Sequence, residues 1–445
     1  MIPFFLFVLF AFVACLLAQV AAKPQRIFEY PYFMAAVYAV FVLPQAYSLA
    51  NFPGGVGSDD VQDVLLMCIL CLAAAVFGYS LRPSESTDKL FSRPVDPSRL
   101  LTMGVGLIVV GVVSTILMPK AEIQIAERGG LTGALTIYMF FGSLTLPGFA
   151  ICVRLLREKF TKGRLAAVLL GAYVPISAIV FGGRREVAVT FALSLVLSSF
   201  YKNRKVPSRI VIFGALFFAM IAIPATGTYR GLVGQGRMDM VTKIRPIDNF
   251  VDFFTQESVL ELRNAAALIN STRIRDTFGW GAAYWNQLVF RFVPAQIVGR
   301  DVKDALMIGK TSSRHLYITE LVNNYEISAG STNTGMGDSY EQFGWFGCLF
   351  FAVLGMFFKS IWTSTLSHDA VFLQVFYIMV CSSAMRTITH QTVDFLPGMV
   401  YQMIFLGGCY VYAKIPERDL LLRGQVRGSA QGRRPVQFRG RGLRR

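Results

Sequence analysis

Long apolar runs separated by short polar stretches recur along almost the whole chain. A helix needs about 20 predominantly apolar residues to cross the hydrocarbon core of a bilayer, and these runs approach that length. The pattern therefore predicts eleven transmembrane helices. The predicted spans lie at 2–22, 32–50, 61–81, 101–118, 132–153, 165–181, 187–200, 209–225, 344–363, 369–385 and 396–413.

Composition supports this interpretation. Of the 445 residues, 54% are hydrophobic and 16% are charged, and the mean hydropathy of +0.51 is too high for a soluble domain of this size. The first run could be a secretory signal, but it is long and lacks a basic start, so we expect a retained span. We predict an all-α, polytopic membrane protein with about eleven transmembrane helices and a large, partly helical extracytoplasmic loop.

Lysine and arginine predict the orientation, because loops rich in these residues stay in the cytoplasm. One alternate set of loops holds 16 of them, and the tail from Lys414 holds 10 more. The short loops of the other set hold 5, and the stretch 226–343 balances 12 basic with 12 acidic residues. We therefore expect the N-terminus outside and the C-terminus inside the cytoplasm. The inward loops lie near 23–31, 82–100, 154–164, 202–209 and 359–368.

The chain divides into four parts. Inside the third quarter of the sequence, 248–270 and 280–299 carry apolar and aromatic side chains at helical spacing, which predicts helices folded onto the membrane. Loops longer than about 15 residues are usually functional or disordered, so function is expected in this stretch. The parts are an eight-helix membrane bundle at 1–225, a large extracytoplasmic loop at 226–343, three membrane helices at 344–413 and a basic, disordered cytoplasmic tail at 414–445.

The net charge of +16 does not indicate nucleic-acid binding. Many of the cations lie in the tail, whose position after the last span predicts attraction to the anionic lipids of the bilayer. The seven cysteines all fall inside predicted spans, so no structural disulfide is expected in the loop. Cys68 and Cys71 form a CxxC only within a transmembrane helix, where core packing accounts for them, and we expect no zinc or redox site.

Two adjacent arginines occupy the tip of a predicted outer hairpin, in the sequence VFGGRREVAV at 180–189. Gly182 and Gly183 permit a tight turn, and the short flanking spans place Arg184 and Arg185 near headgroup depth. Guanidinium groups there suit phosphate oxygens, because a planar fork donates bidentate hydrogen bonds and keeps its charge. The alternative is that the pair only snorkels to the interface, or that Glu186 neutralises one charge.

Other outward charges are expected near the same depth. Arg230 follows the eighth predicted span, and Arg314 and His315 come late in the loop. Arg386, His390 and Asp394 lie at the outer end of the last hairpin. If these segments pack together, they line one cationic cavity. A single arginine at a helix end is commonly only an anchor, so the prediction rests on their shared depth and side.

Candidate acid–base residues lie in STNTGMGDSYEQFGWFG, at 331–347. A desolvated carboxylate at Asp338 or Glu341 could accept a proton from a sugar hydroxyl, because burial raises such a pKa toward the working range. The alternative is a loop leading into a helix N-terminus, where acidic residues offset the helix dipole. The sequence leaves both interpretations open.

The motifs GGRREV, YRGL and GDSYEQFGWFG, with a long outer loop late in the chain, resemble the Wzy-type polymerases of bacterial oligosaccharide repeat units. These O-antigen and exopolysaccharide polymerases are related to O-antigen ligases. The resemblance implies inverting, metal-independent transfer between undecaprenyl-diphosphate-linked glycans on the outer face of the inner membrane. It implies that arginines hold the diphosphate and that a base activates the acceptor hydroxyl. A chain-length regulator is a further partner to expect.

Several choices within this resemblance stay open. The ligases carry a His-Asn or similar pair where this chain has Asn333 and Thr334, which favours polymerase over ligase. A flippase or transporter for the same lipids would be expected to show charges inside the spans and internal symmetry, but most charges here lie at helix ends. No D-x-D pair occurs, so we expect no metal and no cofactor. The candidate bases are Glu341, Asp338, His315 and His390, whereas His368 falls on the cytoplasmic side.

Overall fold

The computed structural model describes residues 1–82, 94–118, 124–125, 131–132, 134–255, 260–309, 319–325, 327, 331–367 and 370–416. Within these residues the chain is helical apart from two short strands, β1 (Gln124–Ile125) and β2 (Leu131–Thr132), which pair antiparallel. The prediction of an all-α membrane protein is therefore confirmed at this level. The tail beyond 416 lies outside the described residues.

Ten helical segments of the described chain are long and apolar enough to cross a membrane. Six are single helices, and four are built from shorter pieces joined end to end. The single helices are α1 (Ile2–Ala22), α4 (Ser58–Ser80), α6 (Pro97–Leu117), α9 (Lys162–Val180), α11 (Arg209–Gly234) and α20 (Val371–Thr389). The composite segments are α2 (Tyr30–Val37) with the π-turn η2 (Tyr38–Val42) and α3 (Leu43–Asn51), α7 (Ala134–Gly142) with α8 (Thr145–Glu158), α18 (Thr334–Phe343) with η5 (Gly344–Cys348) and α19 (Leu349–Thr365), and η6 (Thr392–Asp394) with α21 (Phe395–Ala413).

The seventh predicted span, 187–200, lies within a helix that is not among these ten. Helix α10 (Arg185–Asn203) has the length to span but carries charges at both ends and a polar stripe. The hydroxyls of Thr190 and Ser194 on this stripe are buried and donate to backbone carbonyls one turn earlier. Because α10 packs against α8 and α20, neighbouring helices shield this stripe from lipid.

The membrane segment predicted at 344–363 begins earlier than the sequence pattern indicates. Residues 334–343, which the pattern assigns to the end of the loop, form the mostly buried helix α18. The chain then turns at Gly344, whose φ of +58° favours glycine, and continues through η5 into α19. The predicted loop boundary at 343 therefore falls inside a candidate span, Thr334–Thr365.

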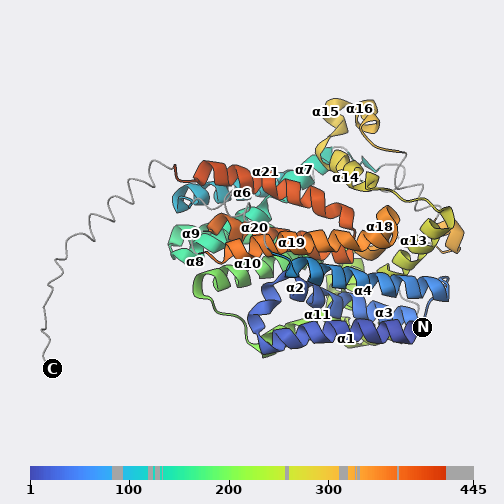
Figure 1. Ribbon diagram of the computed structural model, residues 1–445. Helices are drawn as coiled ribbons and strands as arrows, with labels where there is room; N and C mark the ends of the chain where they lie inside the picture. The colour runs from blue at the N-terminus through green and yellow to red at the C-terminus, as the bar shows by residue number, and fades with distance from the viewer. Residues whose placement is uncertain are drawn as a thin grey trace, which may run out of the picture.

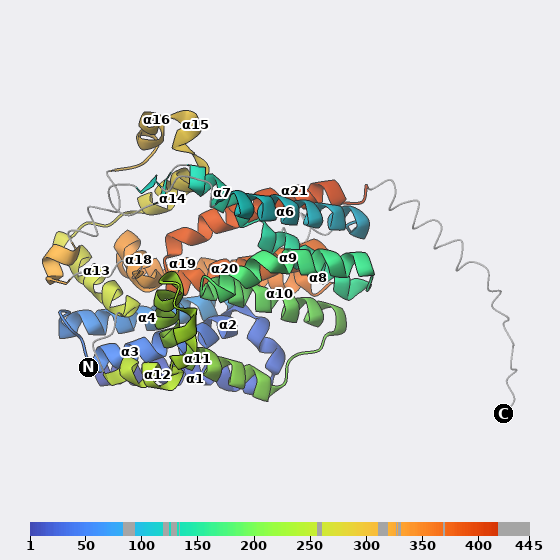
Figure 2. The same cartoon turned by 180° about the vertical axis from the view of Figure 1, so that it is seen from behind.

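The bundle surrounds α20, the most deeply buried of the candidate spans (Figure 1). Close packing of α4 against α19 depends on two glycines, since a Cβ at Gly78 would lie 1.9 Å from the Ala352 carbonyl oxygen and one at Gly355 would lie 2.5 Å from that of Ala75. In contrast, α1, α9 and α11 expose most of their apolar surface at the periphery. Figure 2 shows α11 and α12 from behind, beside α1 and α3. These outer helices have the character of a lipid-facing surface.

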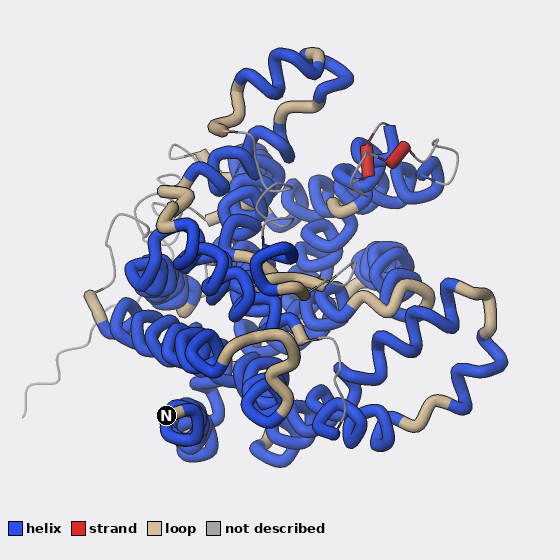
Figure 3. Tube along the Cα trace, turned by 90° about the vertical axis from the view of Figure 1, so that its right-hand side faces the viewer, coloured by secondary structure: helices blue, strands red, loops and turns tan. Residues whose placement is uncertain are grey.

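The segment 235–333, called the connecting segment below, is partly helical as predicted. Its helix α12 packs against α11 and α3, α13 against α4 and α18, and α14 against α21. These elements gather at the end of the bundle where the N-terminus lies, whereas α21 ends at the opposite end (Figure 1). Figure 3 views the bundle from the first of these ends. The described elements are η4 (Met238–Lys243), α12 (Pro246–Thr255), α13 (Glu261–Arg275), α14 (Ala282–Phe292), α15 (Ala295–Val298) and α16 (Arg300–Ala305).

Candidate functional site

Charged side chains from four elements meet at the end of the bundle that carries the connecting segment. Arg386, near the C-terminus of α20, lies between two carboxylates: its NH1 is 3.4 Å from Glu186 Oε1, and its NH2 is 3.4 Å from Asp394 Oδ2. Glu186 belongs to the first turn of α10, and Asp394 to η6. Together with Arg185, Arg291 and His390, these three residues form what we call the arginine cluster.

Arg291 of α14 extends the cluster, and the sequence pattern did not single it out. Its guanidinium carbon lies 5.6 Å from the centre of the Tyr401 ring, while its buried Nε has no hydrogen-bond partner. Burial and the like charge of Arg386 lower the pKa of Arg291. A lone arginine in the apolar stretch AYWNQLVFRF was the only sequence signal for it. Two neighbouring guanidinium groups and a buried donor without an acceptor are suited to an anion.

The hairpin between α9 and α10 divides its two arginines between different environments. Arg185 lies within electrostatic range of Glu261 and Arg230, whereas Arg184 is exposed at the N-cap of α10. Glu261 is largely buried at the start of α13, and this burial raises its pKa even though Arg185 is near. The structure thus directs Arg185 toward the protein charges and leaves Arg184 at the exposed tip.

Arg230 closes this hairpin against the end of α11. Its Nε and NH2 donate to the Gly183 carbonyl at 3.0 and 2.9 Å, and the Tyr229 hydroxyl donates to the Val180 carbonyl. Gly183 has a φ of +55°, and a Cβ there would lie 2.9 Å from Arg230 Cγ. The predicted Gly-Gly turn is therefore confirmed. Two of the N–H groups of Arg230 already serve the turn, which leaves fewer for a ligand.

His390 is the only candidate base that the described residues place beside the cluster. Its Nδ1 lies 2.8 Å from the Thr389 hydroxyl, and the ring keeps access to solvent. Surrounding protein and the charge of Arg386 lower the pKa of His390, although Glu186 and Asp394 partly oppose them. The imidazole is therefore neutral at pH 7 and able to accept a proton.

Asp338 is not a member of the arginine cluster but binds the backbone of η6, the turn to which Asp394 belongs. The buried carboxylate accepts hydrogen bonds from the Thr392 and Val393 amides at 2.8 and 3.2 Å and from the Thr392 hydroxyl. Tyr284 adds a hydroxyl contact to Thr392 at 2.7 Å. Asp338 is 5% exposed, so its position is that of an anchor for η6, from which Asp394 projects toward Arg386.

The remaining predicted residues are not brought into the cluster. Glu341 lies 3.8 Å from Arg275 of α13, and both side chains are largely buried. Arg314 and His315 lie outside the described residues. The described parts of the chain contain no group of three or more His, Cys, Asp or Glu side chains placed to hold a metal ion. The predicted residues that the fold brings together are therefore Arg185, Arg386, His390 and Asp394, with Arg230 at their edge.

Comparison with protein-family models, with curated proteins and with solved structures found no match to this chain. The fold and composition define it as a multi-pass, α-helical membrane protein. Any narrower assignment depends on the chemistry of the arginine cluster.

Proposed function

We propose that the protein polymerises undecaprenyl-diphosphate-linked oligosaccharide repeat units by inverting glycosyl transfer at the outer face of the bacterial inner membrane. The observation that carries this proposal is the buried Arg291 Nε without an acceptor, next to Arg386. Arg291 and Arg386 lie near Glu186 and Asp394, and Arg185 lies near Glu261. Guanidinium groups gathered around a buried donor without an acceptor favour a phosphate-bearing ligand.

The depth of the cluster fits a lipid-borne diphosphate. Glu186 and Arg386 lie at the ends of long helices, and Asp394 precedes α21, so the cluster sits where membrane spans end. The diphosphate of a polyprenyl carrier is delivered at this headgroup depth, whereas the sugars extend into water. We assign Arg185, Arg291 and Arg386 to the diphosphate, and Arg184 and Arg230 to the rim of the same site.

The transfer needs one base and one stabilised leaving group. An acceptor hydroxyl gives its proton to the neutral His390 imidazole and attacks the anomeric carbon of the donor. The bond from that carbon to the diphosphate oxygen breaks, and the diphosphate leaves with the electron pair. Charge grows on the diphosphate during this step, so preorganised guanidinium groups stabilise the transition state more than the ground state. A single displacement inverts the anomeric configuration, and no metal takes part in this proposal.

The first test is the surface polysaccharide of a strain that lacks the gene. We expect single repeat units, on lipid or on core, without long chains. Long chains that accumulate on the carrier would indicate a ligase, and repeat units trapped inside would indicate a flippase.

The second test uses purified protein and lipid-linked repeat units. Arg291→Ala should raise the barrier by about 2–4 kcal/mol, on the scale of a lost oxyanion donor. Arg245→Ala is the matched control, because Arg245 is 82% exposed and its ion pair, with Asp248 three residues further on, is exposed as well. Equal turnover in both variants would reject the proposed site.

A further inference from the structure

A helical hairpin of the connecting segment stands apart from the rest of the bundle. It consists of α15 and α16, which are joined at Gly299 and pack chiefly against each other. Figure 1 and Figure 2 both show this pair beyond α14, on the side of the bundle and not at its end. The site described above uses no residue of the hairpin.

The hairpin is fixed to α14 through polar groups. The Asn286 side chain of α14 forms two hydrogen bonds with the backbone of Ile308: its Nδ2 donates to the carbonyl at 2.9 Å, and its Oδ1 accepts from the amide at 2.8 Å. The Lys303 ammonium donates to the Phe290 carbonyl at 3.0 Å and lies 4.5 Å from the centre of the Phe290 ring. These contacts hold the hairpin in a defined position relative to α14.

Apolar side chains of the hairpin are exposed. Ile297 is 78% exposed, and Val302, Leu306 and Ile308 are exposed as well. Val302 and Leu306 lie four residues apart, so they face the same side of the helix, whereas charged residues occupy the positions before and between them. The charged residues are Arg300, Asp301, Lys303 and Asp304. An apolar face beside a charged face is typical of a segment that lies in a membrane interface.

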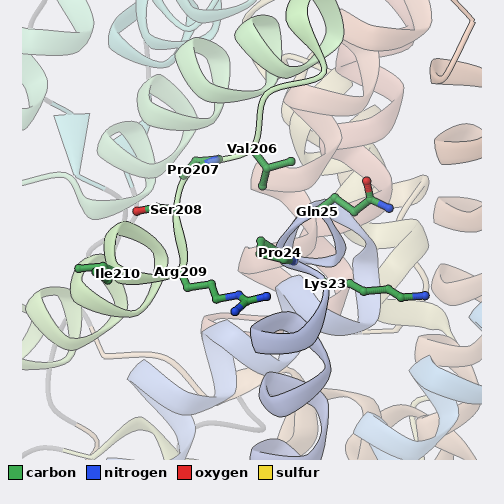
Figure 4. Close-up of a pocket in the computed structure, with 8 residues that line it drawn as sticks. All are labelled: Lys23, Pro24, Gln25, Val206, Pro207, Ser208, Arg209 and Ile210. Atoms are coloured by element: carbon green, nitrogen blue, oxygen red, sulfur yellow. The ribbon is translucent and has the colours of Figure 1, made fainter.

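The candidate span α1 provides a scale for depth in the bilayer. Its 21 residues extend for about 30 Å, the thickness of the hydrocarbon core. Lys23 follows α1, and Arg209 begins α11 nearby (Figure 4), and cations at such helix ends favour a membrane boundary. The other boundary therefore lies near Met1. Figure 1 and Figure 2 both place α15 and α16 short of the N-terminus along this axis, level with the half of α1 nearer to it. The hairpin is thus at the depth of a leaflet and not in the water beyond it.

We propose that the α15–α16 hairpin inserts into the interface of this leaflet, with Ile297, Val302 and Ile308 toward the acyl chains and the charged side of α16 toward the headgroups. Because the hairpin is bound to α14, its insertion fixes the depth of that helix, which carries Arg291. The proposed polymerase activity is not needed for this insertion, since no lipid-linked sugar and no reaction take part in it.

The test places a nitroxide spin label on the hairpin of the full-length protein in nanodiscs of phosphatidylcholine and phosphatidylglycerol. Ile297→Cys carries the label, in a background of Cys15→Ala and Cys348→Ala that removes the two cysteines that are not buried. Oxygen concentrates in lipid and a nickel chelate stays in water, so the ratio of their collision rates with the label reports its depth. We expect a several-fold higher ratio of oxygen to nickel collisions at Ile297→Cys than at Ile274→Cys.

Ile274→Cys is the matched control. Ile274 is also an exposed apolar residue, at 62%, but it lies in the last turn of α13 at the end of the bundle (Figure 1). The preceding residue, Arg273, donates to Asp63 near the start of α4 at 2.8 Å, which fixes this position. A label there should meet the nickel chelate more often than oxygen.

A second variant tests whether the apolar side chains drive insertion. Val302→Asp with Ile308→Asp, added to Ile297→Cys, would bring two carboxylates into the acyl region, so the ratio should fall to that of Ile274→Cys. An unchanged ratio in this variant would overturn the proposal, and so would equal ratios at Ile297→Cys and Ile274→Cys without the two aspartates, because the hairpin would then lie in water. Weak collision with both reagents at Ile297→Cys would also overturn it, because a second protein chain would then cover the hairpin.

Discussion

Two groups of charged side chains lie at opposite ends of this bundle, and they differ in their access to solvent and in how their charge is balanced. In α8, Arg154 is fully buried, its Nε donates to Gln374 at 2.7 Å, and its NH1 lies 2.7 Å from Glu158. Lys202 lies 3.1 Å from the same carboxylate. These partners come from helices that pack against one another, and Arg154 itself is closed to solvent, although its NH2 has no hydrogen-bond partner.

The arginine cluster has the opposite character. Its guanidinium groups come from α10, α14 and α20: Arg291 and Arg386 lie near the same two carboxylates, and Arg185 lies near Glu261. The Nε of Arg291 has no hydrogen-bond partner, and this side chain is open to a ligand at the site. His390 beside them keeps access to solvent. The comparison teaches that burial of an arginine is not by itself a sign of function. Excess donors, together with access for a ligand, distinguish a candidate site from a structural ion pair.

The largest expected effect belongs to the closed group. Glu158→Gln removes the carboxylate beside Arg154 and leaves a fully buried charge without compensation. The free energy of unfolding should fall by about 3–4 kcal/mol, because breaking a buried pair leaves the other charge unpaired. Thermal unfolding in detergent measures this loss. If the variant unfolds at the wild-type temperature, Arg154 does not depend on Glu158, and the contrast between the two groups fails.

Substitutions of Asp338 test whether this residue stabilises η6 or acts as the base. Asp338→Ala leaves the buried Thr392 and Val393 amides without an acceptor, which should lower stability by about 2 kcal/mol and reduce turnover. Asp338→Asn keeps an acceptor oxygen but cannot take a proton. We therefore expect turnover in Asp338→Asn close to wild type. If this variant is as inactive as Asp338→Ala while remaining folded, Asp338 is the base and not an anchor.

Substitution of Arg230 tests how much this residue stabilises the α9–α10 hairpin, and we expect a smaller effect. Arg230→Gln removes the paired donors to the Gly183 carbonyl, so stability should fall by about 1 kcal/mol. Arg237→Gln, an exposed residue just after α11, is the control. Unfolding midpoints of the two variants give the measurement. Equal midpoints would show that Arg230 does not hold the hairpin.

The smallest expected effect is a dependence of ligand affinity on pH, which we attribute to His390. The pKa of His390 in the folded protein lies below the ordinary value of about 6.5. The unliganded protein therefore becomes less stable as the pH falls below that value, because the unfolded chain binds the proton more readily. A bound diphosphate favours the protonated ring and raises the pKa. Affinity for a glycosyl diphosphate lipid should therefore increase a few-fold between pH 8 and pH 6. A His390→Gln variant with the same pH dependence as wild type would contradict this assignment.

The sequence pattern predicted the spans well, because apolar runs of membrane-spanning length have few alternative folds. It missed the polar stripe of α10 and the buried helix α18, since neighbouring helices rather than lipid surround them. The convergence of Arg185, Arg386 and His390 was expected only if the hairpins packed together. Glu341 instead pairs with Arg275, and Arg291 joins from α14, because side-chain proximity between helices depends on packing that periodicity does not encode.

The most direct test of the account is the affinity of the purified protein for undecaprenyl diphosphate in nanodiscs. Arg291→Gln removes the guanidinium whose Nε lacks an acceptor, while Arg245→Gln removes an exposed one. We predict that Arg291→Gln weakens binding at least about tenfold, on the scale of a lost charge-assisted contact, and that Arg245→Gln leaves it unchanged. Wild-type affinity in Arg291→Gln would contradict the claim that the arginine cluster is a diphosphate site.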